Sequence, residues 1–210
     1  MTRWLNHPSR IAAAEFKPVQ LDAARRAGLR VPRTAVTSDP VHAVKFAGSV
    51  GSVVYKPLAG SSIDENDRRR FVYTNVATPD EVSDPAMRLT THLFQEWIEH
   101  DHAVRLTVVD GKFFACAIYA GSDAAHIDWR SDYAALTYAI TEPPEKIKKG
   151  VSTLMAVLGL RFGALDFLIT SSGGWFFLEI NPNGQWAWIE EETGLPIVAA
   201  IADALTGYGT

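Results

Sequence analysis

Cysteine is almost absent from this chain of 210 residues, because Cys116 is the only one. A single cysteine excludes an internal disulfide framework and a zinc site built from cysteines. Cys116 lies between two alanines in an apolar run, so we expect a buried small hydrophobe rather than a nucleophile. No apolar run approaches the roughly 20 residues of a membrane-spanning helix, and the N-terminal MTRWLNHPSR lacks the apolar core of a signal peptide. We therefore expect a cytoplasmic protein without a membrane partner.

An excess of positive charge is also missing. Lys and Arg together number 20 against 24 Asp and Glu, which gives a formal net charge of −4 at pH 7. This balance argues against nucleic acid as a bulk electrostatic partner, since proteins that bind the phosphate backbone carry a basic face. A chain of this length buries roughly 70% of its unfolded surface, so a sizeable core is expected without covalent staples.

The two commonest nucleotide-binding loops are absent too. The chain contains neither GxxxxGK[ST] nor GxGxxG. Lys56 ends an apolar, strand-like run, and the small-residue segment Ala59-Gly60-Ser61-Ser62 follows shortly after it. Taken alone, a lysine at the end of a strand is more often a surface residue than a phosphate ligand. Lys17, directly before Pro18, is equally ordinary when it is considered alone.

Turn residues divide the chain into helices and antiparallel strands. Asp110-Gly111 separates two β-prone runs, 104–109 and 112–119, which is a strong hairpin signal. The loop at 171–174 separates a second pair of runs, 163–170 and 175–181. Hairpins with helices between them predict an α+β fold rather than a parallel doubly wound sheet. We also expect helices over 10–28, 40–46, 142–158 and 194–205, strands over 31–36, 52–56, 71–76 and 92–98, and a mobile loop over 60–70.

The second hairpin predicts that two carboxylates meet. A symmetric loop pairs Thr170 with Trp175 and therefore places Asp166 opposite Glu179, with Asn181 two residues further along the same face. Facing carboxylates destabilise a sheet unless a positive group lies between them. Carboxylates with an amide beside them suit Mg²⁺, which often completes its shell with substrate phosphates. At this point a solvent-facing pair, or a pair that shares a proton, is the alternative.

Four elements in this order resemble the ATP-grasp fold across nearly the whole chain. They are the helix-proximal Lys17, the strand lysine Lys56, the segment 94–98 and the pair Asp166 and Glu179. Further segments are similar to the ATP-grasp maturases of ribosomal peptides, which make the ester and amide macrocycles of graspetides such as microviridins. These segments are Asn6-His7-Pro8-Ser9, Ala14-Glu15-Phe16-Lys17, Val104–Val109, Asp128-Trp129-Arg130 and Asn183-Gly184-Gln185-Trp186.

The resemblance implies a single ATP-grasp unit of two lobes, whose antiparallel sheets clasp the nucleotide. Residues 1–98 would form an N-terminal helical segment and the smaller lobe, and residues 99–210 the larger lobe with the metal site. The nucleotide-binding residues would be Lys17, Lys56, Gln95, Glu96, Trp97, Ile98, Glu99 and Arg105.

The resemblance also implies roles in metal binding, catalysis and peptide binding. Asp166, Glu179 and Asn181 would hold Mg²⁺, as two ions, with Mn²⁺ as a substitute. Arg130 and Lys56 would be catalytic, with Arg130 near the γ-phosphate and the acyl group. Asp128, Trp129, Glu191 and Glu192 would bind peptide, the last two by attracting a basic leader.

The implied reaction transfers phosphate from ATP to a carboxylate, and a hydroxyl or amine of the same peptide then attacks the acyl-phosphate. Such phosphoryl transfer relies on positioning and charge neutralisation, which agrees with the lack of a convincing Ser-His-Asp or Cys-His set. The implied partner is a precursor peptide with its leader, and a homo-oligomer is expected. The alternatives are a ligase that adds free amino acids to a peptide or protein, and a non-catalytic peptide-binding subunit of a full-length ATP-grasp partner.

Two features depart from the family's pattern. ATP-grasp enzymes carry a lobe of roughly 100 residues ahead of the first lysine helix, whereas residues 1–16 precede Lys17 here. Two positions before Arg105 the family places an acidic ribose ligand, where this chain has Ala103, so Glu99 or Asp101 would have to substitute.

Overall fold

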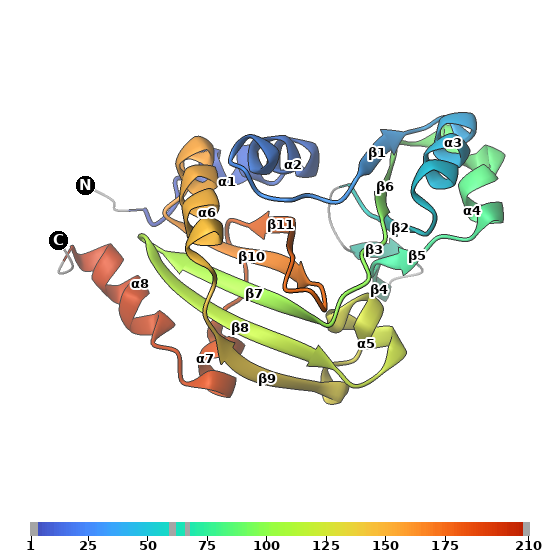
Figure 1. Cartoon of the computed structure of the whole chain (residues 1–210). Helices are drawn as coiled ribbons and strands as arrows, with labels where there is room; N and C mark the ends of the chain where they lie inside the picture. Colours follow the sequence, from blue (N-terminus) through green and yellow to red (C-terminus); the bar gives the residue numbers. More distant parts are fainter. Residues whose placement is uncertain (1–3, 59–61, 66–67, 208–210) are drawn as a thin grey trace. The chain divides into compact units, whose positions relative to one another are not determined.

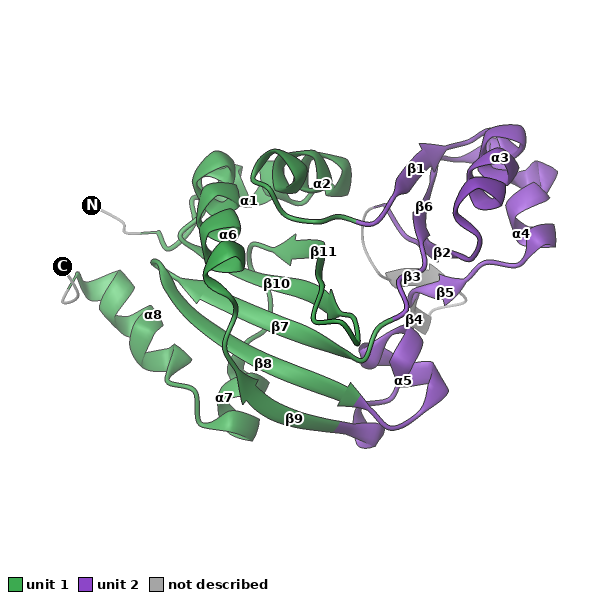
Figure 2. Cartoon of the chain, in the orientation of Figure 1, with its two compact units in different colours: residues 1–31, 100–119, 137–210 green, residues 32–99, 120–136 purple. Residues whose placement is uncertain are grey.

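The computed structural model describes residues 4–58, 62–65 and 68–207, with the backbone alone described for 62–65 and 68–71. The chain divides into two compact units (Figure 2): unit 1 comprises 1–31, 100–119 and 137–210, and unit 2 comprises 32–99 and 120–136. The chain passes from unit 2 to unit 1 between Glu99 and His100, and the division into lobes at 98/99 stays a prediction.

Unit 1 is built on a five-stranded sheet with the order β11-β10-β7-β8-β9. Antiparallel pairs join β11 to β10, β10 to β7 and β7 to β8. Both expected hairpins are present, and Asp110 and Gly111 adopt positive φ values of 49° and 83° at the first turn. The strands are β7 (His102–Val109), β8 (Lys112–Ala120), β9 (Leu136–Thr141), β10 (Phe162–Ile169) and β11 (Trp175–Asn181).

Helices cover both faces of this sheet (Figure 1). On one side lie α1 (Pro8–Ala14), α2 (Lys17–Arg26) and α6 (Glu145–Leu158), and on the other lie α7 (Ala187–Thr193) and α8 (Ile197–Thr206). The main core forms under the first group, because alternate residues of the strands, such as Leu106 and Leu165, pack with Leu21 and Leu154 of the helices. Residues of opposite parity on the same strands therefore face the other way.

Unit 2 contains a four-stranded sheet with the order β1-β6-β2-β5. Its strands are β1 (Thr34–Thr37), β2 (Val53–Lys56), β5 (Asn75–Val76) and β6 (His92–Glu96). Helix α3 (Pro40–Val50) begins where Asp39 accepts a hydrogen bond from the Val41 amide, with Pro40 at its first position. A small core joins it to Val53 and Phe94 of the sheet and to Val82 of α4 (Pro79–Ser83). The remaining helical elements are η1 (Pro85–Leu89), α5 (Asp123–Ile127), η2 (Trp129–Ser131) and η3 (Tyr133–Ala135).

Several sequence predictions of local structure need correction. The helix expected over 10–28 is two helices, because the chain turns at Glu15 and Phe16 before α2 starts. The helix expected over 194–205 is preceded by α7, which ends at Gly194 in a left-handed conformation. The loop expected over 60–70 instead contains the paired strands β3 (Ser62–Glu65) and β4 (Arg68–Phe71), while positions 60, 61, 66 and 67 lie outside the described residues. Of the strand expected over 71–76, Phe71 is the last residue of β4 and Asn75–Val76 form β5, while the residues between them are not in a strand.

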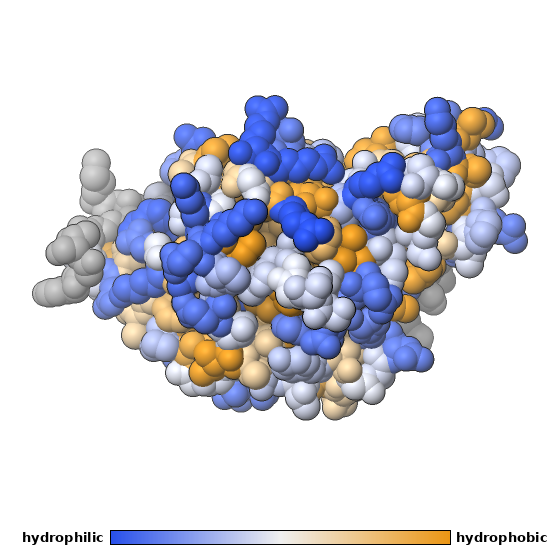
Figure 3. Space-filling model, viewed as in Figure 1, coloured by the Kyte–Doolittle hydropathy of each residue, from blue (hydrophilic) through white to orange (hydrophobic). Residues whose placement is uncertain are grey.

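Within the described residues, no helix is long and apolar enough to cross a membrane. On the face shown in Figure 3, hydrophilic residues are interspersed with smaller hydrophobic patches.

Candidate functional site

A row of charged side chains crosses three neighbouring strands of unit 1. Arg105 on β7 lies opposite Asp166 on β10, and Asp166 lies opposite Glu179 on β11. The Arg105 Nε is 3.1 Å from the Asp166 Oδ1, and both side chains are 6% exposed. The pair predicted from the hairpin is therefore present, and the alternative of a solvent-facing Asp166 is wrong, because Asp166 is buried beside a guanidinium group.

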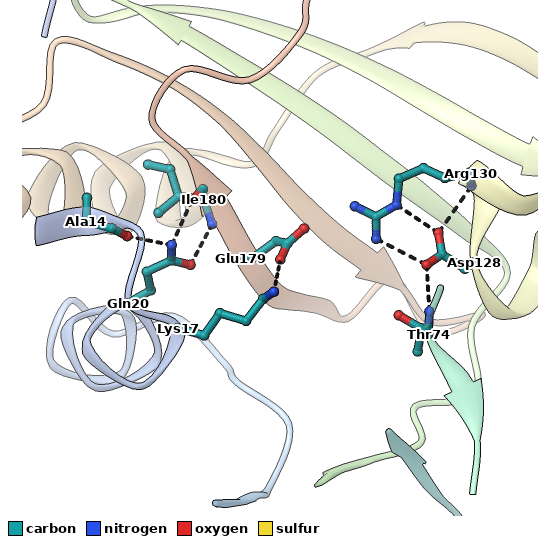
Figure 4. A network of polar contacts seen from close by, with 8 residues as sticks. All are labelled: Ala14, Lys17, Gln20, Thr74, Asp128, Arg130, Glu179 and Ile180. Atoms are coloured by element: carbon teal, nitrogen blue, oxygen red, sulfur yellow. Dashed lines mark hydrogen bonds and ion pairs between the residues drawn. The ribbon is translucent and has the colours of Figure 1, made fainter. Parts of the chain in front are cut away.

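Lysine supplies a second positive charge to this row. The Lys17 Nζ, at the start of α2, lies 3.5 Å from the Glu179 Oε2, with the two side chains 20% and 15% exposed (Figure 4). Each carboxylate thus has a cation beside it, which offsets the repulsion expected between facing acids. Because Lys17 and Glu179 keep some exposure, this end of the row is accessible to a charged ligand.

Glu179 reaches the face of Asp166 because β11 contains a bulge. The hairpin pairs Ile169 with Trp175, one residue away from the predicted Thr170–Trp175 pair, and the Gly174 carbonyl accepts from the Thr170 amide. The register then shifts between Phe167 and Asp166, which leaves Leu178 as the extra residue on β11. In a regular strand Glu179 would share the core face of Phe177, whereas the bulge turns it to the opposite face.

A buried glutamine fastens α2 to β11 beside this carboxylate. The Gln20 Nε2 donates to the carbonyls of Ala14 and Ile180, at 2.6 and 2.8 Å, and its Oε1 accepts from the Ile180 amide at 3.0 Å (Figure 4). Gln20 is one helical turn after Lys17, so the contact that fixes α2 also brings Lys17 to Glu179. Leaving these buried groups without partners would cost about 1–3 kcal/mol per group.

Gln20 was not among the site residues predicted from the sequence, because a glutamine in a helical segment is usually exposed. The structure buries Gln20 with Leu21, Ala23 and Ala24, while Val19 is exposed. The signal that could have identified it is its position three and four residues before two buried alanines. A buried polar residue on the core face of a helix needs hydrogen-bond partners.

The donor set beside Lys17 fits Mg²⁺. Within the described part of the chain, no three His, Cys, Asp or Glu side chains gather as a metal cluster. Asp166 and Glu179 nevertheless supply two facing carboxylates, and Asn181 lies in the adjacent row, opposite Ala164. Across Ala164 from Asn181, the Thr107 hydroxyl oxygen is buried and has no hydrogen-bond partner in the structure. Mg²⁺ is commonly held by one or two carboxylates, with waters and phosphates as its other ligands.

A second polar network lies within unit 2. The Asp128 carboxylate accepts hydrogen bonds from the Thr74 amide at 2.9 Å and from the Arg130 amide, Nε and Nη2 at 3.2, 2.9 and 3.2 Å (Figure 4). Burial raises the pKa of Asp128, but the charge of Arg130 and these hydrogen bonds outweigh it and hold the pKa below the ordinary 3.8. The Arg130 guanidinium also lies 5.5 Å from the centre of the largely buried Trp129 ring. Asp128 therefore fixes Arg130, while its predicted peptide contact stays a prediction.

The segment expected to meet the nucleotide base also belongs to unit 2. Gln95 is buried and donates to the Thr34 hydroxyl at 3.1 Å, while the Glu96 carboxylate accepts from the Arg33 amide at 3.1 Å. Trp97 donates through its indole to Glu99 at 3.2 Å and contacts the His126 ring. Ile98 is buried. Lys56 ends β2, half-buried and opposite Leu93 on β6.

The remaining predicted residues are divided between the two units. Glu191 and Glu192 are exposed on α7 of unit 1. Asp101, also in unit 1, is within 2.8 Å of the His102 Nδ1, whereas Glu99 belongs to unit 2. Cys116 is buried, as expected, and lies opposite Arg105 on the neighbouring strand. Its pKa is raised to about 11, because burial and the charge of Glu192 outweigh a backbone hydrogen bond at Ala139.

The chain is similar to several solved peptide ligases. A Chryseobacterium gregarium RiPP-associated ATP-grasp ligase, in complex with ADP and a leader and core peptide, shares 30% identity and a TM-score of 0.89, over 98% of this chain and 63% of that one. The macrocyclase MdnC from Microcystis aeruginosa MRC, bound to the precursor peptide MdnA, shares 30% identity and a TM-score of 0.84, over 98% and 65%. The ATP-grasp ligase PsnB, complexed with Mg, ADP and a phosphomimetic variant of its minimal precursor, shares 25% identity and a TM-score of 0.78, over 98% and 62%.

These similarities extend over nearly all of this chain but less than two thirds of each solved relative. Neither a protein-family model nor a curated protein matches the chain.

Proposed function

We propose that this chain, which has the ATP-grasp fold and resembles the ribosomal-peptide ligases and macrocyclases with that fold, is an ATP- and Mg²⁺-dependent ligase that closes ester or amide rings in a precursor peptide. The observation that carries this proposal is the row Arg105, Asp166 and Glu179, with Lys17 at its accessible end. Its alternation of positive and negative groups can hold a magnesium–triphosphate complex, which itself carries both charges.

In this proposal the residues of unit 1 bind the phosphate tail. Asp166, Glu179 and Asn181 hold Mg²⁺, which when bound neutralises charge on the phosphates. Lys17 exchanges its contact with Glu179 for a phosphate oxygen, as a flexible ammonium with three donors can do. Arg105 holds Asp166 in place from the buried side.

The roles expected for unit 2 belong to the same proposal. Lys56 contacts phosphate, the segment from Gln95 to Glu99 contacts the base and ribose, and Arg130 stabilises the transferring phosphoryl group. The acidic side chains of Glu191 and Glu192 attract a basic leader. The ATP γ-phosphoryl passes to a peptide carboxylate with release of ADP, and a peptide hydroxyl or amine then displaces phosphate from the acyl-phosphate. One water is lost from the peptide for each ring closed.

Turnover with a synthetic precursor tests this proposal. The protein is incubated with ATP, Mg²⁺ and a peptide that carries a leader and a core rich in Thr, Asp and Glu, and ADP release and peptide mass are measured. We expect peptide-dependent ADP release and a mass loss of one water per ring. Glu179→Gln is expected to lower the rate by roughly 100-fold, whereas Lys146→Met, on the exposed face of α6, should leave it unchanged.

Each other outcome rejects a defined part of the proposal. ADP release that depends on free amino acids, with no loss of water from the peptide, would identify a ligase that extends a peptide or protein. Nucleotide binding without turnover would identify a peptide-binding helper subunit. The absence of nucleotide binding would reject the proposal as a whole.

A further inference from the structure

The strand that carries Glu179 and Asn181 lies at the edge of its sheet. β11 is the first strand in the order β11-β10-β7-β8-β9, so β10 is its only partner among the strands that the structure describes. Along such an edge, alternate backbone amides and carbonyls point away from the sheet and lack a strand partner. Contacts other than hydrogen bonds to a neighbouring strand therefore have to fix the position of these backbone groups.

Segments from the N-terminal part of the chain occupy this open edge. The Arg30 carbonyl accepts from the Phe177 amide at 2.8 Å. Gln20 bonds to both the amide and the carbonyl of Ile180, as a neighbouring strand would do. Two residues further on, the Asn6 Nδ2 donates to the Pro182 carbonyl at 2.7 Å.

The side-chain amide of Asn6 uses both its nitrogen and its oxygen in hydrogen bonds here. Its Nδ2 also donates to the Phe162 carbonyl at 2.8 Å, and its Oδ1 accepts from the amides of Arg161 and Phe162 at 2.8 and 3.1 Å. Asn6 as a whole is 8% exposed. A buried amide that uses both its donors and its acceptor in this way ties the start of β10 to the residue that follows β11.

The side-chain amides of Gln20 and Asn6 thus fix the backbone on either side of Asn181, at Ile180 and at Pro182 respectively. Glu179 is the residue immediately before Ile180, and its outward turn already depends on the bulge at Leu178. We infer that Asn6 and Gln20 are positioning residues, which stand in for a missing neighbouring strand and hold Glu179 and Asn181 in the geometry that binds the metal–nucleotide complex. This inference rests on the proposed function for the identity of that ligand.

The inference is tested by hydrogen exchange and by metal affinity, both measured on the full chain. The variants are Gln20→Met, which keeps shape and removes the hydrogen bonds, and Asn6→Ala. If Gln20→Met does not fold, Asn6→Ala decides the inference, because it removes the hydrogen bond to the Pro182 carbonyl and leaves Gln20 in place. The matched control is Leu154→Ala, which creates a cavity in the same core from α6 but leaves the hydrogen bonds of Gln20 and Asn6 in place.

In the absence of ligand, we expect the Ile180 amide to exchange at least tenfold faster in Gln20→Met than in Leu154→Ala, when both are compared at equal global stability. With ADP present, the Mn²⁺ affinity of Gln20→Met and of Asn6→Ala, measured by electron paramagnetic resonance, should be roughly 10- to 100-fold lower than that of the wild type. This is the usual effect of losing groups that orient metal ligands. Leu154→Ala should keep Mn²⁺ affinity within about twofold of wild type.

Two results would overturn the inference. Unchanged exchange at Ile180 in Gln20→Met would mean that the amide does not hold the strand. Faster exchange with unchanged Mn²⁺ affinity would mean that these residues only protect the edge of the sheet. If the wild-type chain itself binds no Mn²⁺–ADP, the proposed function fails, while the exchange measurement still decides whether the amides hold β11.

Discussion

Removing the charge of Asp166 should expose the energetic importance of its ion pair with Arg105. The two groups lie 3.1 Å apart and are each 6% exposed, so Asp166→Asn leaves a guanidinium buried without its counter-charge. Breaking a buried pair in this way costs about 3–5 kcal/mol of unfolding free energy. For a protein of this size the melting temperature should fall by roughly 6–20 °C, at about 2–4 °C per kcal/mol.

A double-mutant cycle separates this effect from general damage. The cycle consists of Arg105→Met, Asp166→Leu and the variant that carries both substitutions. The double variant replaces the pair with apolar side chains and should recover to within about 1–2 kcal/mol of wild type. Asp203→Asn is the matched control, because its pair with Lys112 has the same 3.1 Å separation but is 46% and 52% exposed. This surface pair should contribute at most about 1 kcal/mol.

The assay is urea unfolding followed by circular dichroism and tryptophan fluorescence, with the slope of the transition checked for each variant. The reasoning would be refuted if Asp166→Asn were no more destabilising than Asp203→Asn. It would also be refuted if the free energies of the single variants simply added in the double variant, because a coupled buried pair cannot be additive.

Three further predictions concern single residues. Because the pKa of Asp128 is lowered from 3.8 in the fold, its ionised form stabilises the folded state above that value. Urea unfolding measures the difference in unfolding free energy between the wild type and Asp128→Asn. This difference should be constant at higher pH and should shrink as the pH falls through the pKa of Asp128 in the folded state. A difference that persists in strong acid would contradict this. Cys116, with its pKa raised to about 11, should react with iodoacetamide at pH 8 roughly 100-fold more slowly than in urea, and comparable rates would show that the thiol is accessible. A Cβ in Gly184→Ala would lie 2.8 Å from the Ala164 Cβ and 2.9 Å from the Asn181 Cβ, so Mn²⁺–ADP affinity should fall about tenfold, whereas Gly48→Ala, with open space around it, should leave the affinity unchanged.

The local features of the fold were predictable where short-range chemistry decides them. Asp110-Gly111 specifies the first hairpin, and the apolar runs on both sides give the correct strands β7 and β8. The pairing of Asp166 with Glu179 was predicted correctly, although the observed register of the hairpin departs from the predicted one at two places whose effects cancel. The loop shifts the pairing by one residue at Trp175, and the bulge at Leu178 shifts it back.

Features that depend on distant parts of the chain could not be predicted in this way. The neighbour of Asp166 on its other side is Arg105, because β10 pairs with β7, and no local pattern specifies that register. Gln20 and Asn6 satisfy backbone groups 160 and 176 residues away in sequence, so their importance appears only when the sheet edge is known. The hairpin of β3 and β4 was missed because its polar, glycine-containing surroundings are typical of loops.

The central claim is that Asp166 and Glu179 bind a metal–nucleotide complex, and calorimetric titration of ADP tests it most directly. The account predicts that wild-type protein binds ADP at least tenfold more tightly with Mg²⁺ than with a chelator present, and that Glu179→Gln abolishes this difference, as loss of a metal ligand should. Equal ADP affinity with and without Mg²⁺ in the wild type, or a magnesium dependence that survives in Glu179→Gln, would contradict the claim.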